Sequence, residues 1–283
     1  MLVLECIPDL LILSMRDRRK VGIIMYRIIS RRPLNSTVTQ MEIEAPLVAR
    51  KARPGQFIIL RVDEEGERIP LTVAATDPEK GTVKIIFQIV GATTEKLNHK
   101  NEGDSLQDFV GPLSEPTKTD RIKKVCIVGG GVGCAIAMPV AQEFHRLGCE
   151  VTSIIGFRNK DIVILENEFK ACSDKLFVMT DDGSYGQHGN VTVPLKEMLE
   201  KGERFDEIIT IGPLIMMKFV VLSAKPFNVP VTVSMNPIMI DGTGMCGCCR
   251  LTLEQDGQRV TKFACVDGPD FNGYEVDFDE AMS

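Results

Sequence analysis

Short hydrophobic runs fill the first part of the chain, from about Met25 to Leu113. The runs MEIEAP, GQFIILRV, LTVAAT and TVKIIFQIVG are rich in Ile, Val, Phe and Thr, as strands are. Proline and glycine separate them at roughly ten-residue spacing, which is typical of antiparallel barrels. We therefore predict an antiparallel β-barrel over residues 25–118, ending in the linker GPLSEPTKTD.

After this linker, hydrophobic strands alternate with helical stretches. The runs KKVCIVGG, EVTSIIGF, KLFVMTDD, EIITIG and VPVTVSM are predicted strands, and helices are predicted over 134–147, 191–201 and 215–225. Such alternation predicts an α/β domain with a parallel sheet over residues 119–233. The Gly- and Cys-rich tail over 234–283 follows neither pattern. In the leader over 1–24 a basic cluster follows a short apolar run, the reverse of a secretory signal, and we assign it no role.

Charge and cysteine usage narrow the class of protein. The formal net charge is −6 and no long basic run occurs, which argues against a nucleic-acid partner. No run of about 18 or more apolar residues occurs, so no membrane span is predicted. Four of the nine cysteines follow residue 245, whereas disulfide scaffolds spread their cysteines through a short chain. We therefore expect a cytoplasmic protein with a metal site near its C-terminus.

A glycine-rich turn joins the first strand of the predicted parallel sheet to the following helix. Its residues are Gly129, Gly130, Gly131, Val132 and Gly133. Glycine lets a dinucleotide pyrophosphate approach the backbone, and a helix N-terminus favours its negative charge. A tight turn without a ligand would also use glycine, and the spacing differs from G-x-G-x-x-G, but the position predicts NAD(P) binding. We expect Pro139 to break or kink the helix.

The turns after later strands carry further candidate nucleotide contacts. Arg158 follows the second strand, Asp182 and Gly183 follow the third, and Gly212 and Pro213 follow the fourth. Open α/β sheets bind ligands at the carboxyl edge that these turns share. Each could be an ordinary turn, and Arg158 could contact an adenosine 2′-phosphate or be a surface arginine. Together they outline one predicted cleft.

The tail carries the strongest chemical signal. Asp241, Cys246 and Cys249 have the spacing D-x4-C-x2-C, and Cys265 follows after fifteen further residues. Plant-type [2Fe–2S] sites use C-x4-C-x2-C and a distant cysteine, and a carboxylate can also bind iron. The additional Cys248 points away from the cluster by this spacing, but could substitute as a ligand. A structural zinc site is the alternative, although the chain has one C-x2-C pair and its three histidines lie far upstream.

Two loops of the predicted barrel carry candidate flavin contacts. The first set is Arg68, Pro70, Leu71 and Thr72, and the second is Gln88, Val90, Gly91, Thr93 and Thr94. A flavin site needs a cation near the pyrophosphate and a hydroxyl near the ring, and a helix N-terminus suits phosphate. Taken alone, these are generic turn residues. The surrounding architecture is what favours a flavin site.

The segments RIPLT, GGGVG, DDGSYG, SMNPIMIDGTGMCGCCR and FACVDGPDF together resemble the ferredoxin–NADP reductase superfamily. From about Met25 onwards the chain is similar to electron-transfer subunits of dihydroorotate dehydrogenase and sulfide dehydrogenase. It is most similar to the small (alpha) subunits of NADH-dependent reduced ferredoxin:NADP oxidoreductases. Asp241 favours this group, because the similar dihydroorotate dehydrogenase subunits carry cysteine at that position. The leader has no counterpart in this pattern, and the stretch between Cys249 and Cys265 is a few residues longer.

The resemblance implies three cofactors: FAD on the barrel, NAD(P)H on the α/β domain and a [2Fe–2S] cluster in the tail. It implies that Arg68, Pro70, Leu71 and Thr72 contact FAD, that Thr93 and Thr94 lie near its phosphates, and that Asp241, Cys246, Cys249 and Cys265 ligate the cluster. Nicotinamide transfers two electrons as hydride, a cluster takes one, and a flavin can do both.

The resemblance further implies a larger flavin or iron–sulfur partner subunit in a heterodimer, with ferredoxin reached through that partner. One alternative is an electron-transfer subunit of a dihydroorotate or sulfide dehydrogenase, which the identity of the partner would distinguish. The other is a nucleotide-sensing module with structural zinc, which would be colourless.

Overall fold

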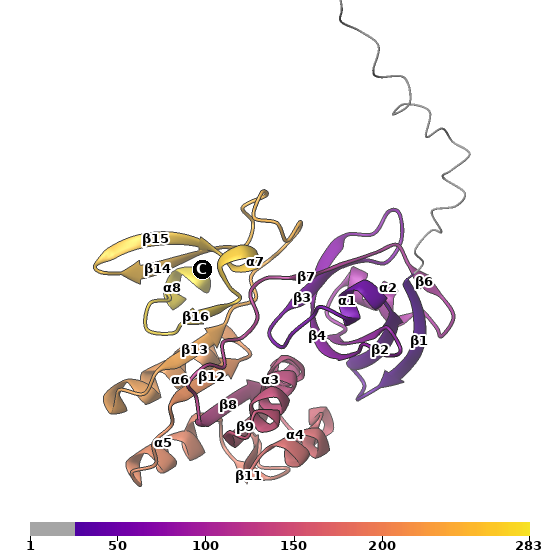
Figure 1. Cartoon of the computed structure of the whole chain (residues 1–283). Coiled ribbons are helices and arrows are strands. Elements are labelled where there is room, and N and C mark those ends of the chain that lie inside the picture. The colour runs from indigo at the N-terminus through magenta and orange to yellow at the C-terminus, as the bar shows by residue number, and fades with distance from the viewer. Residues whose placement is uncertain (1–25) are drawn as a thin grey trace, which may run out of the picture.

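The first part of the chain forms an antiparallel β-barrel (Figure 1). The computed structural model describes residues 26–283, so the leader expected over 1–24 lies outside the described residues. The sheet order is β6-β1-β2-β5-β4-β3-β7, and all neighbours are antiparallel. The strands are β1 (Tyr26–Pro33), β2 (Val38–Glu44), β3 (Phe57–Arg61), β4 (Arg68–Asp77), β5 (Thr82–Gln88), β6 (Ser105–Leu106) and β7 (Asp108–Leu113), with the short helices α1 (Pro46–Ala49) and α2 (Ala92–Asn98).

The barrel closes around its own hydrophobic core. Phe87 on β5 and Phe109 on β7 are almost fully buried there, with Met41 and Ile43 of β2. The pairing register shifts within β1, β3 and β4, and such bulges bend a sheet. The predicted antiparallel barrel is confirmed.

The second sheet has the order β11-β10-β9-β8-β12-β13-β16. Every pair is parallel except that of β13 with β16. The strands are β8 (Lys124–Gly130), β9 (Glu150–Phe157), β10 (Lys175–Thr180), β11 (Gln187–His188), β12 (Glu207–Ile211), β13 (Val231–Ser234) and β16 (Asp270–Asn272). The predicted parallel α/β sheet is confirmed, and a strand from the tail extends it.

Helices cover both faces of this sheet (Figure 1). α3 (Cys134–Arg146) and α4 (Glu166–Cys172) pack on one face, and α5 (Thr192–Glu200) and α6 (Leu214–Ala224) on the other. The short helices η2 (Gly131–Gly133), η3 (Lys160–Ile162) and η4 (Lys225–Phe227) lie in connections. We predicted a break or a kink at Pro139. α3 continues through Pro139 without a break, because both turns around this buried residue pack on the sheet and offset the lost hydrogen bond. No helix in residues 26–283 is long and apolar enough to cross a membrane.

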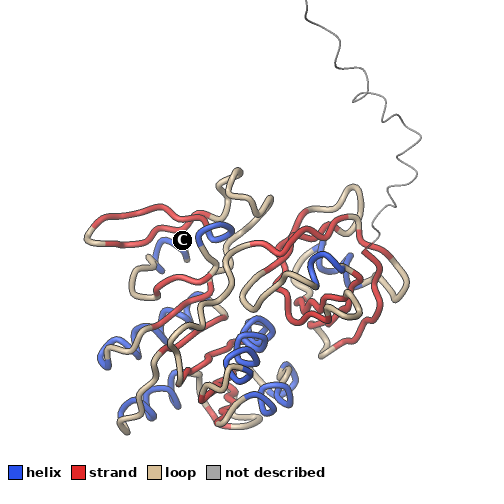
Figure 2. Tube along the Cα trace, viewed as in Figure 1, coloured by secondary structure: helices blue, strands red, loops and turns tan. Residues whose placement is uncertain are grey.

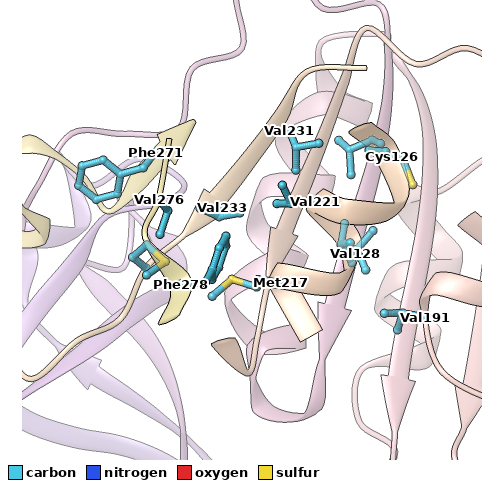
Figure 3. Packing of buried hydrophobic residues seen from close by; sticks show 14 of the residues in the cluster. Cys126, Val128, Val191, Met217, Val221, Val231, Val233, Phe271, Val276 and Phe278 are labelled. Atoms are coloured by element: carbon cyan, nitrogen blue, oxygen red, sulfur yellow. The ribbon is translucent and has the colours of Figure 1, made fainter. Parts of the chain in front are cut away.

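The tail shares the core of the second sheet. Figure 3 shows Phe271, Val276 and Phe278 beside Val233 and Met217. The remaining elements of the tail are the hairpin β14 (Arg250–Gln255) and β15 (Gln258–Phe263), and the helices α7 (Ala264–Asp267) and α8 (Phe278–Ala281). Between β13 and β14 the chain is irregular (Figure 2), and this segment carries the D-x4-C-x2-C motif.

Candidate functional site

A cavity of about 240 Å³ lies where the barrel, the start of α3 and the tail meet. Its barrel wall includes six residues of the predicted flavin set: Pro70, Leu71, Thr72, Gln88, Val90 and Thr94. These come from β4, from the end of β5 and from the turn into α2. The structure therefore brings both predicted flavin loops to one cavity.

The other three predicted flavin residues lie outside this wall. Arg68 begins β4 and is exposed. Thr93 Oγ1 donates to Glu67 at 3.3 Å, and the Gly91 N–H donates to Thr94 Oγ1 at 3.1 Å. Gly91 and Thr93 lie at the start of α2, next in sequence to the cavity residues Val90 and Thr94.

Of the residues in the opposite wall, only Val132 was a predicted cofactor contact, as part of the glycine turn. Val132, Ala135 and Ile136 line it from the glycine turn and α3, and the tail supplies Ser234, Met235, Asn236, Met239 and Pro269. The only sequence signal was the segment SMNPIM, which directly precedes the cysteine motif. Residues from the predicted flavin, nucleotide and cluster regions thus share one cavity.

The positions of the glycine turn require glycine for different structural reasons. A Cβ on Gly133 would lie 2.6 Å from the Ile211 carbonyl oxygen, and one on Gly130 would lie 2.3 Å from Met216 Sδ. These glycines let the turn pack against the end of β12 and the start of α6. Gly131 differs, because its φ is +55° and no atom lies within 4 Å of its Cβ position. Gly131 therefore faces open space that a ligand can occupy.

The other predicted nucleotide residues lie along the same carboxyl edge. The Asp182 N–H donates to the Arg158 carbonyl at 3.3 Å, which joins the ends of β9 and β10. A Cβ on Gly212 would lie 3.1 Å from the Gly130 nitrogen, so the end of β12 meets the glycine turn. Pro213 precedes α6, and Gly183 has a φ of +71° in the turn after β10.

Two cysteines of the motif form a buried pair. The Sγ atoms of Cys249 and Cys265 are 3.2 Å apart, and the Cys265 N–H donates to Cys249 Sγ at 3.4 Å. Burial, followed by the neighbouring Cys249 thiol, raises the pKa of Cys265 to about 12. As a free thiol Cys265 would stay protonated at neutral pH, and a bound metal ion would stabilise its thiolate.

Asp241, which is half-buried, and Cys246, which is exposed, form a second pair. Asp241 Oδ1 accepts from the Thr243 N–H at 2.8 Å, and Oδ2 accepts from the Cys246 N–H at 2.9 Å. The Thr243 hydrogen bond contributes most to holding the pKa of Asp241 below its ordinary value. The carboxylate thus orders the loop as well as supplying oxygen ligands. Cys248 is exposed beside this pair.

The four predicted ligands therefore lie as two pairs. Within residues 26–283, no three His, Cys, Asp or Glu side chains converge on one metal-ion position. A [2Fe–2S] cluster takes two protein ligands on each of two irons, whereas structural zinc takes four around one ion. The two-pair arrangement fits the donor pattern of the cluster, with sulfur and oxygen donors that both bind iron.

The loop that carries these ligands packs against the barrel. A Cβ on Gly242 would lie 2.7 Å from Leu113 Cδ1 of β7 and 3.1 Å from Ile59 Cγ1 of β3. Because its φ is also +72°, Gly242 has two reasons to be glycine. Met239, two residues before Asp241, lines the 240 Å³ cavity. The candidate cluster loop and the candidate flavin cavity are therefore direct neighbours.

Comparisons with known proteins agree with this geometry. Residues 236–277 match the family model for the iron-sulfur cluster binding domain of dihydroorotate dehydrogenase B. The chain is 47% identical over 261 residues to a dihydroorotate dehydrogenase B (NAD(+)) electron transfer subunit homolog of Thermotoga maritima, covering 92% of this chain and 90% of that protein. It is 31% identical to the corresponding electron transfer subunit of Streptococcus pneumoniae serotype 4, covering 87% and 97%.

Solved structures point to the same group. A chain of the NADH-dependent reduced ferredoxin-NADP oxidoreductase, a structure described in terms of flavin-based electron bifurcation, is 44% identical, with a TM-score of 0.84 and 92% of each chain covered. A ferredoxin reductase of carbazole 1,9a-dioxygenase, 17% identical with a TM-score of 0.61, shares the fold over 74% of this chain and 68% of that one. The resemblance inferred from the sequence is confirmed: the chain belongs to the family of dihydroorotate dehydrogenase B electron-transfer subunits and their homologues, oxidoreductase subunits of the ferredoxin–NADP reductase type.

Proposed function

We propose that this subunit moves electrons between NAD(P)H, FAD and a [2Fe–2S] cluster, to or from a larger partner subunit of an NADH-dependent ferredoxin:NADP oxidoreductase. One observation carries the proposal: the 240 Å³ cavity has walls from the barrel, the glycine turn and the segment before Asp241. A flavin bound there would exchange hydride with nicotinamide and single electrons with the cluster. The 44% identity to the oxidoreductase chain over 92% of both chains supports this partner type.

The barrel residues hold the flavin. Pro70, Leu71 and Thr72 supply an apolar wall with one hydroxyl, and Thr94 orders the turn into α2 by accepting the N–H groups of Val90 and Gly91 at 3.0 and 3.1 Å. Arg68, Gln88 and Thr93 supply polar groups at the entrance. We assign this role to residues 25–118.

The carboxyl edge of the second sheet binds the nicotinamide nucleotide. Gly131 leaves the space beside the N-terminus of α3 open, and that helix of thirteen residues favours a negatively charged pyrophosphate. Arg158 and Asp182 flank this edge. Val132 reaches the flavin cavity, so the residues that would hold the nucleotide adjoin that cavity. We assign this role to residues 119–233.

The tail over 234–283 holds the cluster through Asp241, Cys246, Cys249 and Cys265. The buried Cys249–Cys265 pair excludes water from one side, and the Asp241–Cys246 pair is more open to solvent through the exposed Cys246. Glycines of the loop allow its backbone N–H groups to approach the sulfur atoms, which tunes a cluster.

Spectroscopy on anaerobically purified protein tests this function. We expect a yellow-brown protein that contains flavin and iron and whose flavin absorbance bleaches when NADH or NADPH is added. Separate titrations with each nucleotide determine the nicotinamide specificity. A colourless, zinc-containing protein that neither nucleotide alters would rule the proposal out.

Replacing Asp241 with cysteine tests the oxygen ligand. The variant is expected to retain iron, because thiolate also binds it, but to show a changed visible spectrum and a changed cluster potential. Redox titration monitored by absorbance measures both. Cys248→Ser in the same loop is the control and should leave the spectrum unchanged. An Asp241→Cys spectrum identical to that of the wild type would remove Asp241 from the ligand set.

The partner subunit docks around the cluster loop. Ile238 and Met245 are 78% and 88% exposed, and Ile240 and Val266 are also exposed nearby, although large apolar side chains normally avoid such exposure in a group. Met245→Glu should weaken association by about tenfold, the effect of losing one well-packed anchor. Calorimetry with the purified partner measures it. Leu47→Glu, on barrel helix α1, is the matched control; equal losses in both variants would place the interface elsewhere.

A further inference from the structure

A second and larger cavity lies beside the flavin cavity, under the linker between the barrel and the α/β sheet. Its volume is about 850 Å³. Linker residues 115–120 form one side, and Glu207 of β12, Thr232 of β13, and Asp270 and Asn272 of β16 form the other. None of the cofactor roles proposed above uses it. A cavity of this size with several charged residues in its wall accommodates several water molecules.

Asp270 lies at the boundary between the two cavities. Its carboxyl group is buried; Oδ2 accepts from Thr117 Oγ1 at 2.6 Å, and Oδ1 has no hydrogen-bond partner within the described residues. Asp270 is paired directly with Ser234 across β13 and β16, and opposite residues of an antiparallel pair lie on the same face about 5 Å apart. Asp270 lines the large cavity, whereas Ser234 lines the flavin cavity. The pair therefore connects the two.

The surroundings of Asp270 allow its carboxyl to hold a proton. Burial raises its pKa, and the hydroxyls of Thr117 and Ser234 offset part of that rise. Burial likewise raises the pKa of Glu207, which accepts from the Thr232 hydroxyl at 2.8 Å. The other charged or titratable groups around the cavity are Glu115, Lys118, Asp120, Lys225, Asp267 and Tyr274. No ion pair among the described residues holds Asp270 in its charged form.

The proposed function requires a separate route for a proton. Oxidation of NAD(P)H by one-electron acceptors yields NAD(P)+, two electrons and one proton. The electrons leave through the cluster, but the proton must leave the flavin cavity by groups that can exchange protons. Positioned acids and bases perform such transfers.

We propose that Asp270 carries this proton between the flavin cavity and solvent in the 850 Å³ cavity, with Ser234 as the hydroxyl between them. The inference rests on the proposed function. Ser234 gives its hydroxyl proton to the Asp270 carboxylate and takes one from the flavin cavity. Asp270 then releases its proton to water in the large cavity, and the same groups act in reverse when electrons flow the other way.

The test compares Asp270→Asn, which cannot exchange the proton, with Asp270→Glu, which can. Anaerobic full-length protein is mixed first with NAD(P)H alone, and then with NAD(P)H and excess ferricyanide, which takes single electrons. Flavin bleaching by NAD(P)H is hydride transfer and should be unchanged in Asp270→Asn. Turnover with ferricyanide should fall by about 100-fold and show a larger solvent deuterium isotope effect. Asp270→Glu should restore most of the rate.

Two further variants keep the test decisive. Glu207→Gln removes the other buried carboxyl of the cavity and should leave both rates unchanged. Ser234→Ala retains Asp270 and should slow ferricyanide turnover as Asp270→Asn does, so the relay remains testable if Asp270→Asn fails to fold.

Infrared spectroscopy provides a readout that does not depend on turnover. The wild type at neutral pH should show the carbonyl stretch of a protonated carboxylic acid that is missing in Asp270→Asn and present in Glu207→Gln. Normal flavin bleaching with unchanged ferricyanide turnover in Asp270→Asn would overturn the relay alone. Absence of bleaching in the wild type would overturn the proposed function, and the relay with it.

Discussion

Cys265→Ser protein is expected to lose the iron-sulfur cluster almost completely. Cys265 is buried with its Sγ 3.2 Å from that of Cys249, so one substitution removes half of the buried ligand pair. A serine hydroxyl is a poorer ligand for iron than a thiolate. Iron and acid-labile sulfide should fall to near background, and ferricyanide turnover should depend on flavin alone. Chemical analysis and the visible spectrum measure the loss.

The control for this loss is another buried cysteine far from the loop. Cys172 ends α4 and belongs to the core between α3, α4 and the sheet. Cys172→Ala removes a buried sulfur at a cost of about 1 kcal/mol, but should keep the full iron content. Normal iron in Cys265→Ser, or equal loss in Cys172→Ala, would contradict the assignment of Cys265 as a ligand.

Gly133→Ala is expected to disable the nucleotide site through packing. The φ of Gly133 is −57°, so alanine fits the backbone, but its Cβ would lie 2.6 Å from the Ile211 carbonyl oxygen and 2.7 Å from Gly212 Cα. Those are backbone atoms, so the end of β12 must move away from the glycine turn. We expect a loss of about 1–3 kcal/mol in unfolding free energy and little flavin bleaching by NAD(P)H. Denaturant unfolding and stopped-flow absorbance measure the two effects.

Comparing Gly131→Ala with Gly148→Ala distinguishes a methyl group that fills the nucleotide site from the backbone strain that both substitutions cause. Both glycines have positive φ and open space at the Cβ position, so each substitution costs about 1–2 kcal/mol of strain. Only Gly131 lies in the proposed nucleotide site. Gly131→Ala should weaken NAD(P)H binding, whereas Gly148→Ala should not. If Gly133→Ala matched Gly148→Ala in both measurements, the packing argument would be wrong.

Repeating local patterns made most of the fold predictable from the sequence. Strand-like runs separated by proline and glycine predicted the barrel, and alternation of strands with helical stretches predicted the parallel sheet. The helix α4 (Glu166–Cys172) was missed because its seven residues give little helical periodicity. The helix does not break at Pro139, because tertiary packing outweighs one missing hydrogen bond.

The sequence of the tail predicted the ligands of a metal site, but it did not predict how the tail folds. The D-x4-C-x2-C spacing identified candidate ligands, but β16 and the shared core depend on contacts between distant segments, such as Phe271 with the α6 side of the sheet. The flavin cavity shows the same limit. Its barrel wall followed from local loops, whereas Ser234 and Met239 reach it only through the fold of the tail. The different packing of Gly131 and Gly133 likewise appears only when β12 is in place.

We propose that the Asp241–Cys265 region holds two irons that exchange electrons with a flavin in the adjacent cavity. Electron paramagnetic resonance of anaerobically purified protein, recorded before and after NAD(P)H is added, tests this. We expect about two irons and two acid-labile sulfides per chain, and a reduced-cluster signal that appears as the flavin absorbance bleaches. Protein without iron and sulfide, or a cluster that stays oxidised while the flavin is reduced, would contradict it.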